Sequence, residues 1–165
     1  MKLDEVLNKI ITAAYNEAKS RKHEYFTPEH ILYAMLFFEE GREFVENCGG
    51  DPEQLKSELN AYLKNHVESI EGVQITESVS LQKIIQIAGM HVISSEREVI
   101  RLGDIVVAIF DQEEGFGSYY MRKQGISRLD ILNYLAHGIS TLSVEDDTND
   151  FNIGEEAKAK EENEN

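Results

Sequence analysis

The sequence of this chain contains an internal repeat. The segment KIITAA at residues 9–14 returns as KIIQIA at residues 83–88, and ILYAML at residues 31–36 returns as IVVAIF at residues 105–110. Both matches have the same offset in residue number, from 9 to 83 and from 31 to 105, and unrelated amphipathic segments have no reason to share one offset. The sequence therefore predicts a duplication, in which two copies of one structural unit pack against each other.

The periodicity of apolar residues predicts that each copy is helical. Within residues 3–18 the apolar side chains recur three and four positions apart, as on one face of an amphipathic helix. Thr27 and Pro28 are typical of the N-cap and the first position of a second helix. We expect Ser80 to cap the first helix of the second copy.

These patterns predict an all-α fold of eight helices, built as two pseudo-symmetric four-helix repeats in one compact domain, residues 1–140. Repeat one covers residues 1–65, a connector residues 66–79 and repeat two residues 80–140. Four short helices leave an apolar face open, so we expect the repeats to need each other and the groove between them to bind a partner. Residues 141–165 hold nine acidic residues and two lysines, which predicts a disordered acidic tail or linker.

Charge and cysteine content restrict the partners and the compartment. The formal net charge of −15 repels phosphate backbones and anionic lipids, so we expect no nucleic-acid or membrane partner and favour a protein with a basic surface. Cys48 is the single cysteine, which excludes an internal disulfide. A lone cysteine, an acidic N-terminus without a signal-peptide pattern and the lack of a long apolar run indicate a cytoplasmic protein.

The motifs that would support catalysis are absent from the sequence. There is no phosphate-binding loop and no His-Glu-x-x-His motif, and the five histidines are scattered without the spacing of metal ligands. His30 falls among core-facing positions, which predicts a structural histidine. We therefore expect no cofactor, no metal and no enzyme activity. The competing class is a small helical metal-binding protein or enzyme. Metal analysis of the purified protein distinguishes this class from a protein that binds no metal.

Two motifs resemble one protein family. HEYFTPEHIL at residues 23–32 is similar to the H-E-x-x-T-x-E-H-(I/L)-L signature of the N-terminal domains of Clp-type AAA+ unfoldases, and GISRLDILN at residues 125–133 resembles the closing helix of the ClpA branch. The resemblance implies a docking domain that a flexible linker joins to two ATPase modules, which feed proteins to the ClpP peptidase. The sequence lacks those modules, so we expect the docking domain of a longer unfoldase. The alternative is a free-standing Clp N-domain protein that modulates a protease in trans.

The resemblance also implies a partner and a surface. In the ClpA branch the domain binds the adaptor ClpS, which delivers substrates, and it also receives protein substrates directly. The implied partner-binding residues lie where the first helix ends and the second begins, and at the start of the fifth: His23, Glu24, Thr27, Glu29, Ser78 and Lys83. Exposed carboxylates at Glu24 and Glu29 would accept charge-assisted hydrogen bonds from a basic partner, with Lys83 giving the reciprocal contact. Structural alternatives stay open: Thr27 as a cap, Glu29 as an acid favoured at a helix N-terminus, and Lys83 as a solvated residue.

The second repeat departs from the family motif. It has RLGD at residues 101–104 where repeat one has TPEH at residues 27–30, so it lacks both the hydroxyl cap and the glutamate. In the related ClpC branch, phosphoarginine pockets use this glutamate in each repeat, and here only Glu29 remains. We therefore do not expect a paired phosphoarginine receptor.

Overall fold

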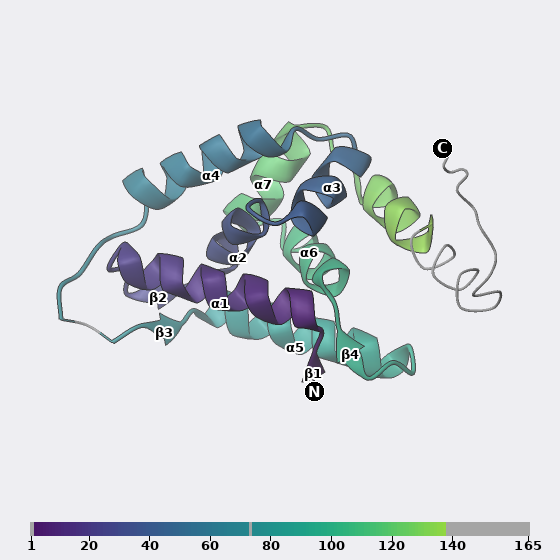
Figure 1. The fold of residues 1–165 in the computed structure, drawn as a ribbon, viewed down its shortest axis with the longest axis horizontal. Helices are drawn as coiled ribbons and strands as arrows, with labels where there is room; N and C mark the ends of the chain where they lie inside the picture. Colours follow the sequence, from purple (N-terminus) through teal and green to yellow (C-terminus); the bar gives the residue numbers. More distant parts are fainter. Residues whose placement is uncertain (1, 73, 138–165) are drawn as a thin grey trace. The chain divides into compact units, whose positions relative to one another are not determined.

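The computed structural model describes residues 2–72 and 74–137, most of which are helical (Figure 1). In chain order the elements are β1 (Lys2–Leu3), α1 (Glu5–Ser20), β2 (Tyr25–Phe26), α2 (Pro28–Met35), α3 (Glu39–Asn47), α4 (Pro52–Asn65), β3 (Thr76–Glu77), α5 (Val79–Ser94), β4 (Val99–Ile100), α6 (Leu102–Asp111) and α7 (Phe116–Lys123). An eighth helical segment covers residues 128–137. The predicted all-α fold is confirmed. Residues up to Arg128 form one unit and the residues after it a second.

The duplication is visible in the backbone. α1 begins at residue 5 and ends at residue 20, and α5 begins at residue 79 and ends at residue 94, so both bounds move by the offset of the sequence repeat. Lys22 and Glu96, which the same offset relates, have positive φ angles of 61° and 60°, which is uncommon for residues other than glycine. The two repeats therefore share their backbone conformation at the level of single residues.

In the described part of the chain, four two-residue strands connect the repeats. β1 pairs with β4 in parallel, with Lys2 opposite Val99, and β2 pairs with β3 in parallel, with Tyr25 opposite Thr76. The repeat offset relates Lys2 to Thr76 and Tyr25 to Val99, so exchanging the two copies turns one pair into the other. This is the relation that a twofold axis between the repeats produces.

The start of α5 corrects the predicted boundaries. The helix is capped by Ser78, whose hydroxyl accepts the Leu81 N–H at 3.0 Å, and the predicted cap at Ser80 is wrong. Ser78 keeps an extended conformation because its own N–H donates to the Phe26 carbonyl at 2.9 Å, at the end of the ladder between β2 and β3. The predicted connector, residues 66–79, therefore contains a strand as well as exposed chain.

The core of the first unit is centred on α2. All residues of α2 are buried, and this helix contacts α1, α4 and α7 (Figure 1). The inner faces of the long helices complete the core, and its largest fully buried side chains are Phe110, Leu7, Ile10, Ile31, Leu32, Met35, Leu36, Leu55, Leu59, Leu63, Leu81 and Ile84. A polar side chain on α2 must consequently find its partners inside the protein.

Candidate functional site

The ladder between β2 and β3 brings two distant parts of the sequence together. The carbonyl of Phe26 accepts the N–H of Ser78, so the loop between α1 and α2 lies beside the start of α5. We define the junction face as residues 23–27 and 76–78. It contains most of the residues for which the family resemblance implies partner binding.

The structure places these residues at different depths. His23 and Glu29 are buried, Glu24, Thr27 and Ser78 are half-buried, and Lys83 is exposed on α5. The structure thus brings Glu24, Thr27 and Ser78 to one surface, with Lys83 further along α5. His23 and Glu29 are instead directed into the protein.

The expectation that Glu29 offers an exposed carboxylate is wrong. The residue is 8% exposed, and its Oε2 accepts the backbone N–H of Gly117 at 3.3 Å. Gly117 lies in the first turn of α7, where the helix dipole stabilises a negative charge. Because α2 is buried on all sides, position 29 meets a helix of the other repeat. Glu29 therefore links the two repeats.

His23 and His30 form a buried pair in repeat one. His23 Nδ1 and His30 Nε2 are 2.8 Å apart, and the Thr27 N–H donates to His30 Nδ1 at 3.0 Å. Burial is the main reason that the pKa of both rings is lowered; for His30 the neighbouring His23 and Arg21 add to it, and its pKa falls to about 3. His30 is thus a structural histidine, as the sequence predicts, and His23 is its partner.

Repeat two fills the equivalent positions with an ion pair. The repeat offset relates the two histidines to Arg97 and Asp104, and the Arg97 guanidinium donates to Asp104 Oδ1 at 2.7 Å. Asp104 Oδ2 accepts the N–H of Arg101, the N-cap residue of α6, at 2.8 Å. Asp104 therefore does for α6 what His30 does for α2.

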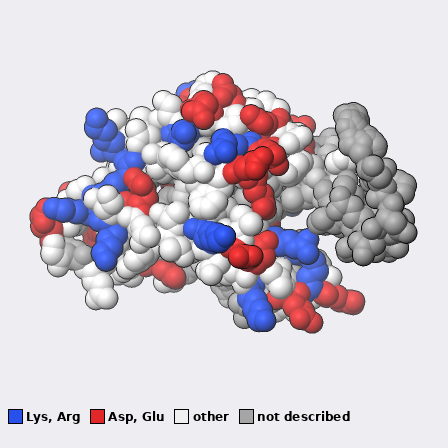
Figure 2. All heavy atoms as spheres, viewed as in Figure 1, with Lys and Arg blue, Asp and Glu red and all other residues white. Residues whose placement is uncertain are grey.

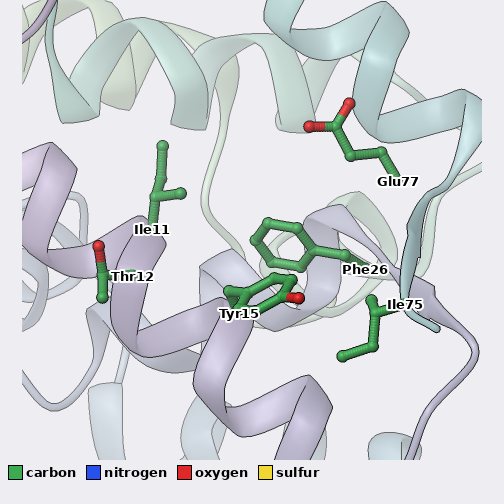
Figure 3. Close-up of a pocket in the computed structure, with 6 residues that line it drawn as sticks. All are labelled: Ile11, Thr12, Tyr15, Phe26, Ile75 and Glu77. Carbon is green, nitrogen blue, oxygen red and sulfur yellow. The ribbon is translucent and has the colours of Figure 1, made fainter.

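A pocket of about 400 Å³ opens beside the junction face (Figure 3). Its walls come from α1, β2, the residue before β3 and β3 itself: Ile11, Thr12, Tyr15, Phe26, Ile75 and Glu77. The rings of Tyr15 and Phe26 meet edge to face, with their centroids 5.7 Å apart. Apolar walls with one carboxylate among the lining residues suit a bulky apolar side chain that carries or adjoins a positive charge.

Repeat two does not reproduce the side chains of this pocket. At the positions that the repeat offset relates, Tyr15, Phe26 and Glu77 are replaced by Gly89, Ile100 and Leu3. The aromatic walls and the carboxylate therefore have no counterpart at the positions that the repeat offset relates to them.

The outer face of α5 is the second point at which the repeats differ. Val79, Ile87, Met90 and Ile93, which we define as the α5 stripe, are 81%, 38%, 62% and 63% exposed and share one side of the helix. The equivalent residues on α1 are Glu5, Ala13, Asn16 and Lys19. The same helical surface is therefore apolar in one repeat and mostly polar in the other.

Neither the pocket nor the α5 stripe was predicted from motifs or from the apolar period. A signal for them exists in the repeat itself, because residues at equivalent positions of the two copies should be alike where the fold alone decides. Exposed positions that are polar on α1 and apolar on α5 are not alike, so a comparison of the two copies indicates the α5 stripe.

Charge is mixed over the surface that Figure 2 displays. Acidic and basic side chains are interspersed there, with uncharged areas between them. In the described part of the chain, no three His, Cys, Asp or Glu residues gather closely enough to hold a metal ion. Among residues 2–72 and 74–137, the helices are also too short or too polar to cross a membrane.

Fold and surface together define a class of protein: a duplicated helical domain whose halves share a backbone and differ at their exposed faces. The family model of the Clp repeat (R) N-terminal domain matches residues 2–124. The chain belongs to this family.

Individual relatives agree with this assignment. A ClpA homolog protein of Fuscovulum blasticum is 33% identical over 138 residues, which cover 81% of this chain and 17% of that protein. The N-terminal domain of Hsp104 from Candida albicans superimposes with a TM-score of 0.70 at 16% identity, covering 79% of this chain and 87% of that one. The N-domain of ClpV from Vibrio cholerae gives 0.69 at 20% identity, covering 84% and 86%. The chain thus has the fold of Clp N-domains and spans less than a fifth of the length of the ClpA homolog.

Proposed function

We propose that this chain is a docking domain that recruits an adaptor of the ClpS kind, or protein substrates directly, to an ATP-dependent Clp unfoldase. The observation that carries the proposal is the difference between the outer faces of α5 and α1. Both helices use equivalent inner positions, such as Leu7 and Leu81, to reach the core, so folding does not require their outer faces to differ. An exposed apolar surface without a folding role is typical of a protein-binding site.

The junction face supplies the polar part of the proposed surface. Glu24 can accept a hydrogen bond from a cationic side chain, and Lys83, which lies on the same side of α5 as the α5 stripe, can donate to a carboxylate. The pocket that Tyr15 and Phe26 help to line offers an anchoring position for one bulky side chain of the partner. Glu29 has no place in this surface because it is buried.

The unfoldase itself lies outside this chain. The ClpA homolog is much longer than the segment that matches, and we place the ATPase modules in the corresponding remainder of the full protein. The peptidase ClpP would be reached through those modules. The docking domain would then select the protein to be unfolded, and the ATPase modules would carry out ATP hydrolysis.

A matched pair of double variants tests the docking surface. Met90→Glu with Ile93→Glu places charge on the α5 stripe, and Asn16→Glu with Lys19→Glu makes equivalent changes on α1. By calorimetric titration with a recombinant ClpS-family adaptor, we expect affinity to fall at least about tenfold for the α5 variant and less than about twofold for the α1 variant. Thermal midpoints should stay near that of the wild type, because all four positions are exposed. Undiminished affinity of the α5 variant would contradict the proposal.

A further inference from the structure

The buried histidine pair has only one arrangement of protons that satisfies its neighbours. The Thr27 N–H points at His30 Nδ1, so the proton of the neutral His30 ring lies on Nε2, which donates to His23 Nδ1. The His23 ring is in turn hydrogen-bonded to the backbone of Leu63 on α4. A second proton on either ring would turn an accepting nitrogen into a donor that faces another donor.

The charged groups around the pair do not favour that second proton. Arg21, from the end of α1, disfavours a positive charge on both rings, and Glu17 from the same helix favours one on His23. The carboxylate of Glu17 already accepts from Arg21 Nε at 2.7 Å, which offsets much of its effect. On the α2 side the Thr27 hydroxyl lies 2.8 Å from His30 Nδ1, beside the Thr27 N–H that donates to the same nitrogen, and on α4 Leu63 contributes its backbone. Protonation is therefore accommodated by breaking the pair apart.

The pair fastens the junction face to the rest of repeat one. The backbone N–H of His23 donates to the Ala18 carbonyl at 3.0 Å, and His23 also forms an antiparallel bridge with Ser69. Its ring reaches His30 on α2, while the chain that follows it forms β2, which pairs with β3. Separating the two rings would release the first residue of the junction face from α2 and loosen the ladder beyond it.

We propose that the His23–His30 pair is a pH-sensitive latch, and that acidification opens the junction face of repeat one while leaving the equivalent ladder of repeat two closed. The consequence for partner binding rests on the proposed docking function, whereas the latch itself does not. In repeat two the corresponding contact is the ion pair between Arg97 and Asp104. That pair contains no imidazole, the side chain whose charge ordinarily changes between pH 5 and pH 8.

The sign of the effect follows from linkage between proton binding and structure. Burial lowers the pKa of His23, and that of His30 falls from 6.5 to about 3. Opening the latch returns the rings to water, where they bind protons below about pH 6.5. The contribution of the pair is therefore complete above about pH 6.5 and is lost progressively as the pH falls toward about 3.

The experiment uses two amide protons that the twofold relates. The Ser78 N–H donates to the Phe26 carbonyl in the ladder between β2 and β3, and the Asp4 N–H donates to the Ile100 carbonyl in the ladder between β1 and β4. Hydrogen exchange of the full 165-residue chain would be followed by NMR at pH 7 and pH 5, with each rate corrected for intrinsic exchange. We expect the protection of Ser78 relative to Asp4 to fall roughly 25-fold, from His30 alone. A ratio that stays constant between pH 7 and pH 5 overturns the latch.

A grafted variant gives a second, independent measurement. His23→Arg with His30→Asp transfers the ion pair of repeat two into repeat one, and its protection ratio should stay constant between pH 7 and pH 5. A ratio that falls as in the wild type would show that the histidines are not the sensor. If the grafted variant does not fold, the protection ratio of Ser78 to Asp4 in the wild-type chain still tests the latch. Neither measurement involves a partner, so failure of the latch leaves the docking proposal standing, and failure of docking leaves the latch standing.

Discussion

Repeat one and repeat two solve one structural problem with different chemistry. At the start of α2, His30 accepts the N–H of the N-cap residue and is hydrogen-bonded to His23. At the start of α6, Asp104 accepts the N–H of the N-cap residue and pairs with Arg97. The backbone is the same in both places, so the fold requires an acceptor for the cap and a link to the preceding loop. It does not specify a neutral pair or an ionic one, and this leaves each repeat free to respond differently to pH and salt.

The long helices show the same separation between interior and surface. The inner positions of α1 and α5 are alike, for example Ala14 and Ala88, because both pack against a neighbouring helix at equivalent depth. Their outer positions have diverged to a mostly polar face and an apolar stripe. On these two helices the buried positions keep similar residues in both copies, and the residues differ at positions that are exposed to solvent.

The largest expected effect compares equivalent core positions. Leu36 and Phe110 occupy the same place in the two repeats and are both fully buried, and the Arg122 guanidinium lies 3.9 Å from the centroid of the Phe110 ring. Phe110→Ala should lower the free energy of unfolding by about 3–5 kcal/mol and Leu36→Ala by about 2–4 kcal/mol, because the aromatic site loses more contacts and a cation–π interaction. Equilibrium unfolding in urea measures both. A clearly larger loss at Leu36 would mean that the two cores are not equivalent.

A smaller effect is expected from the ion pair of repeat two. Arg97→Ala leaves the Asp104 carboxylate, whose side chain is 9% exposed, without its charged partner, and should cost about 1–3 kcal/mol. Lys9→Ala is the control, since it removes an exposed pair with Glu5 that contributes less than about 0.5 kcal/mol. The comparison uses urea unfolding at two salt concentrations. Equal costs for the two variants would show that burial does not strengthen the ion pair.

The smallest effect is a gain in stability on α5. Gly89 takes the position of Tyr15, and a Cβ added there would meet only the Ile100 Cδ1 at 4.0 Å. Gly89→Ala should raise the free energy of unfolding by about 0.5–1 kcal/mol through helix propensity. Thermal denaturation should show a higher midpoint than the wild type. Gly125→Ala is the opposite control, because the φ of 87° at Gly125 disfavours a side chain, and a lowered midpoint for Gly89→Ala would indicate a backbone need for glycine.

Much of the helical framework could be predicted from the sequence. Thr27 and Pro28 mark the start of α2, as their cap and first-turn preferences predict. The strands could not be predicted, because two residues are too few for an alternating pattern. The burial of Glu29 was also missed, since its position depends on the first turn of α7, which is far away in the sequence. The partner-binding roles of Glu24, Thr27, Ser78 and Lys83 stay predictions.

The duplication, the helical class and the inward faces of the helices all follow from the order of the residues. Apolar periodicity and helix capping depend on residues a few positions apart, so they can be recognised in the sequence. The common offset between the repeated segments shows which residues of the two copies correspond. Three features depend on the packed structure: the contact of His23 with His30, the contact of Glu29 with α7, and the pocket beside β2 and β3. Those contacts join segments that are adjacent only after the helices pack, so their geometry depends on the packing of the whole unit and has no local signature in the chain.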